Sequence, residues 1–407
     1  MASHDQNAPV DASRTDASGG DKTSGDAAGR TRRWQLHGRT PAFLPILLAT
    51  AALFLISLVF EPQSVRHSAL LGMLPFAGVL AVAAMGQTLV VQQGGIDLSV
   101  PGMISLTVVL LTSYPNGDSG KLGVAILLAF GATLAAGVLN GAMVSAIGVT
   151  PIVATLGMNA LLYGGVIQIS GGNPPPTTHA LARFAGGKVA GIPNALLIAI
   201  VLTAILAVVI KRTVLGRRFE AVGAGLFGAR AAGLEARRYQ FVAYVAAAAL
   251  YCTSGVLLAG IVSSPGAFQG DSYLLPTVAA VVLGGTSLLG GRGSVVATAI
   301  AALFISQLDQ FVLVTGASQG VQSLVDAGAL AVGLAIYSVP WRRWVRRYGR
   351  SSRDGPRPAE EIVEPGLPMR GETRARLASG PASDTGPRLA PGTASEARAR
   401  LAPEPQK

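Results

Sequence analysis

The sequence predicts an all-α membrane protein, a polytopic transmembrane bundle of about ten helices. Half of the 407 residues are hydrophobic and only 13% are charged, a balance typical of chains that fold in a lipid bilayer. Apolar runs close to twenty residues long, the length that crosses the hydrocarbon core, recur between residues 41 and 340. The basic residues gather in the two tails and in one internal loop, where they would set membrane orientation.

Each apolar run gives one candidate span. In order, the spans are expected at 41–60, 70–91, 98–114, 122–143, 150–169, 192–210, 239–262, 273–289, 294–314 and 321–340. Glycine is abundant, with 51 residues, and small residues inside spans let helices approach closely.

The two ends differ in composition from the membrane domain at 41–340. Residues 1–40 are rich in Ser, Asp and Gly, cannot bury a core, and end in an arginine-rich flank. Residues 341–407 begin with the aromatic and basic sequence WRRWVRRYGR and continue rich in Pro, Ala and Arg. We expect two disordered cytoplasmic tails, the second opening with an interfacial collar.

The loop Lys211–Arg238 fixes the predicted orientation. It carries seven basic residues against two acidic ones, and short basic loops stay on the cytoplasmic side. Both tails are basic too, so six spans must precede this loop and four must follow it, or each number must change by two. The run 98–114 is short and holds Pro101, but omitting it would place one basic region outside. The chain is therefore expected in the plasma membrane with both termini cytoplasmic, and with Gly171–Gly191 and Ser263–Ser272 outside.

Several function classes are excluded or disfavoured by what the sequence contains. The net charge of +11 is explained by membrane orientation, so no nucleic-acid partner is expected. Cys252 stands alone in an apolar run, as a small core residue would. The sequence has no phosphate-binding loop of the GxxxxGK[ST] type and no histidine pattern with metal-ligand spacing. We expect no enzyme, no metal and no cofactor.

Two glycine clusters interrupt the apolar pattern, at 92–99 (QQGGIDLS) and at 284–293 (GGTSLLGGRG). Each follows one apolar run and precedes another. Paired interruptions in two halves are typical of internally duplicated transporters. Asp97 and Ser99 stand just before a helix whose first turn tolerates Pro101. They are interpreted as caps for that helix, as residues of a broken segment that lines the substrate path or a gate, or as both.

Asp309 lies within an apolar span, with Gln310 beside it. A carboxylate at mid-depth costs about 2.5–3.5 kcal/mol on insertion scales, so it should face the bundle interior or water. Asp309 and Gln310 would then either contact substrate or bond a neighbouring helix. Gln322 and Asp326 in the last span are weaker candidates of the same kind.

Five stretches taken together give the sequence a family resemblance. They are GGIDLS at 94–99, PIVATLGM at 151–158, GRRFEAVG at 216–223, GARAAG at 228–233 and VVLGGTSLLGGRGS at 281–294. In order and spacing they resemble the membrane permeases of ribose-type ATP-binding-cassette (ABC) importers, over about residues 40–340.

The resemblance implies an all-helical subunit that works as a pair with a second copy or a paralogue. Its other partners would be a cytoplasmic ABC ATPase, an extracytoplasmic sugar-binding protein and membrane lipid. Residues 224–238 would hold the short coupling helix that rests on the ATPase, and the docking loops would be Gly171–Gly191 and Ser263–Ser272. The coupling residues would be Gly225, Leu226, Phe227, Gly228, Arg230, Gly233 and Arg238. At Gly225–Gly228 the sequence departs from the family's Asn-Pro/Glu-Glu-Ala, so the helix would lack the capping residue and the acidic first turn of that pattern.

The resemblance also implies a monosaccharide or polyol substrate. Asp309-Gln310 stands where sugar permeases commonly have an amide pair, and Asp97-Leu98-Ser99-Val100 differs from the amino-acid branch of the family. The predicted path residues are Asp97, Ser99, Asp309 and Gln310. The alternatives are an ABC permease for nucleosides or branched-chain amino acids, an ion-gradient-driven transporter with ion sites at Asp97 and Asp309, and a nonconducting scaffold or sensor.

Overall fold

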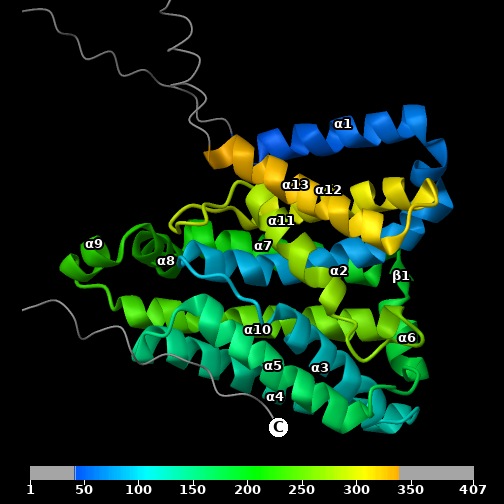
Figure 1. Ribbon diagram of the computed structural model, residues 1–407, viewed down its shortest axis with the longest axis horizontal. Coiled ribbons are helices and arrows are strands. Elements are labelled where there is room, and N and C mark those ends of the chain that lie inside the picture. The colour runs from blue at the N-terminus through cyan, green and yellow to red at the C-terminus, as the bar shows by residue number, and fades with distance from the viewer. Residues whose placement is uncertain (1–40, 42, 339–407) are drawn as a thin grey trace, which may run out of the picture. The chain divides into compact units, whose positions relative to one another are not determined.

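The computed structural model describes residues 41 and 43–338. The predicted tails at 1–40 and 341–407, with the collar at 341–350, lie outside the described residues. Within them the chain is almost wholly helical (Figure 1). The exception is a short antiparallel hairpin in which Lys188 pairs with Pro193 and Val189 with Ile192.

The main elements follow the predicted order of apolar runs. They are α1 Leu44–Phe60, α2 His67–Gln92, α3 Val100–Ser113, α4 Leu122–Ala142, α5 Pro151–Ser170, α6 His179–Ala185, β1 Lys188–Val189, β2 Ile192–Pro193, α7 Asn194–Arg212, α8 Val214–Ala224, α9 Leu226–Ala231, α10 Ala236–Ile261, α11 Leu274–Leu283, α12 Val295–Val314 and α13 Gln319–Ser338. Short single turns join some of them, and a π-turn at Met143–Ile147 continues α4.

Six helical segments in the described part of the chain are long and apolar enough to cross a membrane. They are His67–Gln92, Ser119–Ile147, Pro151–Ser170, Asn194–Arg212, Ala236–Ile261 and Val295–Val314. The other four predicted spans correspond to shorter apolar helices at Leu44–Phe60, Val100–Ser113, Asp271–Leu283 and Gly320–Ala335. The chain is thus a multi-helix membrane bundle, and a span count of ten stays a prediction.

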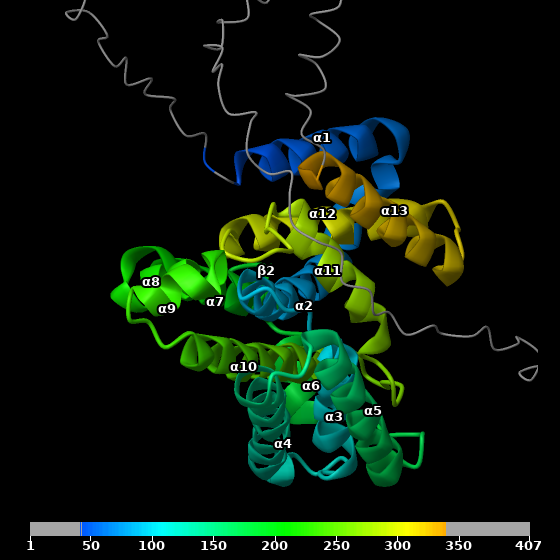
Figure 2. The same ribbon diagram turned by 60° about the vertical axis from the view of Figure 1, so that its left-hand side comes forward.

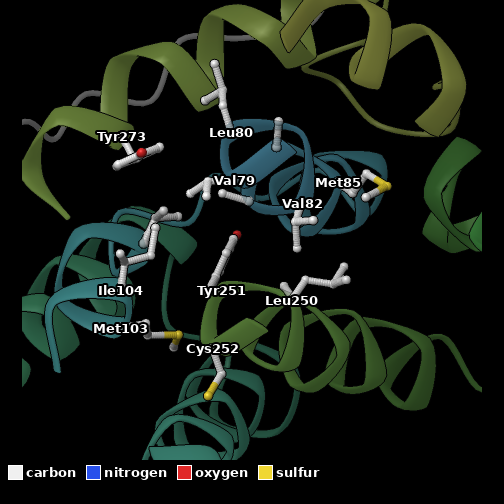
Figure 3. Close-up of a cluster of buried hydrophobic side chains, with 14 of the residues drawn as sticks. Val79, Leu80, Val82, Met85, Met103, Ile104, Leu250, Tyr251, Cys252 and Tyr273 are labelled. Carbon is white, nitrogen blue, oxygen red and sulfur yellow. The ribbon is translucent and has the colours of Figure 1, made fainter. Parts of the chain in front are cut away.

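The two longest helices, α2 and α10, form the centre of the bundle. They pack against each other, and in both views α3, α4 and α5 lie on the far side of α10 while α1, α12 and α13 lie beyond α2 (Figures 1 and 2). Figure 3 shows Val79 of α2, Ile104 of α3 and Tyr251 of α10 close together in the core, while Leu80 points to the other side of α2. Cys252 is fully buried there, as its apolar surroundings predict.

The loops gather at two opposite ends of the bundle. Helices α8 and α9 lie at one end, and α6 and the β1–β2 hairpin lie at the other (Figure 1). At the second end, the Thr177 N–H donates to the Ser263 carbonyl at 3.2 Å, and the Ala180 N–H donates to Ser119 Oγ at 3.3 Å. The connections predicted to share the outer side are therefore in contact with each other.

Candidate functional site

The two glycine clusters that interrupt the apolar pattern meet in space. The Gly291 N–H donates to the Gln92 carbonyl at 2.9 Å. A Cβ added at Gly293 would stand 2.5 Å from Gln92 Nε2, closer than real Cβ atoms pack. The segment after α2 and the segment before α12 thus touch through main chain, and glycine is what allows that approach.

The end of α8 joins the same contact. Gln93 Nε2 donates to the Phe219 carbonyl at 2.9 Å. A Cβ at Gly223 would stand 2.0 Å from the Gln92 carbonyl oxygen, and one at Gly290 would stand 2.7 Å from the Gly223 carbonyl oxygen. We call Gln92, Gln93, Gly223, Gly290 and Gly291 the glycine junction. It ties α8 to both interruptions.

Helix α9 follows α8 after one residue and presents an exposed surface. Phe227 is 88% exposed, a high value for a large apolar side chain. On the inner face of α9, buried Ala229 packs with Val222 of α8 and Ala236 of α10. No side chain caps the helix at Gly225 and its first turn has no acidic residue, as the departures from the family pattern predicted. A short helix is thus fixed on one face and bare on the other.

The remaining predicted coupling residues surround α9. Arg230 in its last turn is exposed, and Gly233 adopts φ +76°, a left-handed turn that favours glycine and ends the loop. Arg238, in the first turn of α10, pairs through Nε with Glu235 at 2.6 Å. The structure therefore brings the whole predicted coupling set onto one end of the bundle.

Asp97 is fully buried in the first interruption and is held by its neighbours. Its Oδ1 accepts from the Ser99 N–H at 2.9 Å and from Ser99 Oγ at 2.5 Å, and Asn140 Nδ2 of α4 donates to Ser99 Oγ at 2.9 Å. Asp97 thus accepts the N–H of Ser99, the residue just before α3, whereas neither side chain bonds the free N–H groups inside the helix. One of these, the Gly102 N–H, donates instead to Asn159 Oδ1 of α5 at 2.8 Å.

Four residues around Asp97 and Ser99 were missed by the sequence reasoning: Gln87, Asn140, Tyr244 and Tyr251. The Gln87 amide lies 3.2 Å from both the main-chain nitrogen and the carbonyl oxygen of Asp97, and 3.0 Å from the Tyr251 hydroxyl. Tyr244 approaches from α10. Polar residues inside two apolar runs, Gln87 and Asn140, were the available signal. Asp97 is thus the centre of a buried polar network joining α2, α4 and α10.

Asp309 and Gln310 belong to a different region. The carboxyl group of Asp309 interacts with that of Asp326 on α13, a neighbouring helix that packs against α12. Asp309 lies fourteen residues along α12 from Val295, which is about 21 Å of helix, whereas the first interruption contacts Gly291 and Gly293 just before that helix. The structure therefore separates the four predicted path residues into two pairs.

One known protein family matches the helical part of the chain. Residues 69–337 match the family described as "Branched-chain amino acid transport system / permease component". The chain belongs to this family of permeases. The family consists of transport components rather than enzymes, in agreement with the sequence analysis.

Curated relatives of the permease agree with this assignment. It is 29% identical to the ribose import permease protein RbsC of Escherichia coli over 312 residues, 75% of this chain and 95% of the relative. It is 34% identical to a probable ABC transporter permease protein of Sinorhizobium fredii over 63% of this chain and 77% of the relative. It is 32% identical to the fructose import permease protein FruF of Bifidobacterium longum over 61% of this chain and 71% of the relative. No solved structure matches the chain.

Proposed function

We propose that this permease is the membrane subunit of an ABC importer for a monosaccharide or polyol in the plasma membrane. A separate cytoplasmic ATPase would power it and an extracytoplasmic binding protein would deliver substrate. The observation that carries the proposal is the exposed helix α9, joined through α8 to both interruptions at the glycine junction. The printed names of relatives that import ribose and fructose support the substrate class.

The proposed topology has ten spans, with both termini and the Lys211–Arg238 loop cytoplasmic. Loop contacts support it, because the Gly171–Gly191 and Ser263–Ser272 connections touch each other, whereas α8 and α9 lie at the opposite end of the bundle (Figure 1). The first end would receive the binding protein. The second end would rest on the ATPase.

Coupling would run from α9 through α8. ATP binding by the ATPase would shift α9, and the main-chain contacts of Gly223 would pass that shift to Gln92 and Gly290. A close-packed contact transmits displacement because it has no slack to absorb it. The ATPase must also prefer one of the two conformations, since a partner without that preference moves nothing.

The two polar groups receive different roles. Asp309 and Gln310 are partly exposed in the outer part of α12 and would contact substrate along the path, alone or with a second copy or paralogue. Asp97 and Ser99 are fully buried and would act indirectly, by fixing the shape of the broken segment beside the path.

Reconstitution of the purified chain into proteoliposomes tests the proposal. We expect uptake of labelled ribose, fructose or a related sugar only when the ATPase, ATP and the binding protein are all supplied. Uptake by the chain alone under a proton or sodium gradient would support the secondary transporter instead. Sugar uptake that is unchanged in cells lacking the chain would support a scaffold or sensor.

A further inference from the structure

A groove lies beside the coupling region, and none of the predicted path residues lines it. It has a volume of about 520 Å³ and is bounded by α7, α8 and the first turns of α10, with Leu89 of α2 on its lining. We call it the α7–α10 groove. Along α10 its lining runs from Arg238 to Ala246, about 12 Å of helix.

The lining is apolar along most of the groove, and its charged side chains lie at the α8 end, beside Leu215, Phe219 and Leu234. Arg218, Arg238 and Tyr239 line it at the α8 end, whereas Leu206, Val242 and Ala246 line it farther along the bundle. A tyrosine between charged and hydrocarbon surfaces is typical of the membrane–water boundary. The groove thus combines an apolar channel with a basic mouth.

The charge of the mouth is positive. Arg238 is partly neutralised by Glu235, at 2.6 Å, but among the described residues no ion pair is formed by Arg218. The surrounding loop Lys211–Arg238 adds further positive charge, with seven basic residues against two acidic ones. An occupant with an anionic head and an apolar tail therefore fits both parts of the groove.

We propose that the α7–α10 groove binds one anionic phospholipid, with its phosphate at Arg218 and Arg238 and an acyl chain along Val242 and Ala246. A zwitterionic lipid would match the apolar part but gains little from the positive mouth. The chain's own carboxyl-terminal segment 341–350 is itself strongly basic and so does not match the mouth. The bound lipid would join α8 to α10, the two helices that flank α9, and would hold the coupling surface in place.

Native mass spectrometry of the delipidated full-length chain tests this proposal. Phosphatidylglycerol and phosphatidylcholine with identical acyl chains are titrated separately. We expect one phosphatidylglycerol to bind with at least fivefold preference, since one arginine near a lipid surface contributes about that factor. Arg218→Gln should remove about fivefold of the preference, and Arg218→Gln with Arg238→Gln should abolish it.

Neighbouring arginines supply a matched control. Arg217→Gln with Arg237→Gln removes the same charge from the same loop, but neither residue lines the groove, so the preference should persist. Ala246→Phe should fill the apolar part and weaken binding of either lipid there. Equal binding of the two lipids, or equal loss in both double variants, would overturn the proposal. A chain dimer that depends on Arg218 but not on lipid would show that a second copy occupies the groove.

Discussion

Replacing Gly223 with alanine is the sharpest test of the proposed coupling route. The added Cβ would stand 2.0 Å from the Gln92 carbonyl oxygen, where ordinary contact begins at 3.4 Å, so the junction must open by about 1.4 Å. Overpacking of this kind costs about 1–3 kcal/mol, and 1.4 kcal/mol changes an equilibrium tenfold. We expect sugar uptake per ATP hydrolysed to fall at least tenfold in proteoliposomes containing the ATPase and binding protein, while ATP hydrolysis stays above half of wild type.

Two other glycines separate crowding at the junction from crowding elsewhere. Gly216→Ala places a Cβ 2.2 Å from the Ile210 carbonyl oxygen, so it strains the α7–α8 contact without touching the interruptions. Gly131→Ala meets nothing within 4 Å and should behave as wild type. If Gly223→Ala folds, elutes as a single species and still transports with the wild-type ratio of uptake to hydrolysis, the junction does not carry coupling and the reasoning fails.

Three further predictions follow from the site. Phe227→Asp puts a charge on the exposed face of α9. It should weaken co-purification of the ATPase at least tenfold, while the thermal unfolding transition of the isolated chain stays within about 2 °C of wild type. Normal co-purification would contradict the proposal that this face of α9 binds the ATPase. Asn140→Ala removes the amide that donates to the buried Ser99 hydroxyl, and the unsatisfied oxygen costs about 1–3 kcal/mol. The thermal unfolding temperature should therefore fall, and an unchanged unfolding temperature would argue against the Asp97 network. For Asp309 and Asp326, a double-alanine cycle on thermal stability should give a coupling of about 0.5–3 kcal/mol; additive effects would show that the two carboxyl groups act independently.

Much of the fold could be predicted from the sequence because the bilayer constrains it strongly. A helix in hydrocarbon must satisfy its own backbone, so apolar runs of the right length become helices in order. The ten predicted runs correspond to ten helices in the described residues, and the short run with Pro101 is α3, with the proline in its first turn. A short helix within residues 224–238 was expected from the family resemblance, and α9 forms there, whereas its coupling role stays a prediction.

The site depended on contacts that no local pattern encodes. Asp97 and Asp309 both look like path residues from their sequence surroundings. In the structure Asp97 is enclosed by Gln87, Ser99 and Asn140, whereas Asp309 interacts with Asp326 on a neighbouring helix. Side-chain partners across helices depend on helix rotation and crossing, which periodicity alone does not determine.

The sequence by itself determined the class of this protein, the order of its helices and the position of the segment that we propose faces an ATPase partner, because hydrophobic length, charge and motif are written along the chain. Only the tertiary structure decided that the two glycine-rich interruptions meet, and that Gly223 meets them there. Those contacts join residues about 70 to 200 positions apart. They exist because glycine lets three main-chain segments approach more closely than any side chain would allow.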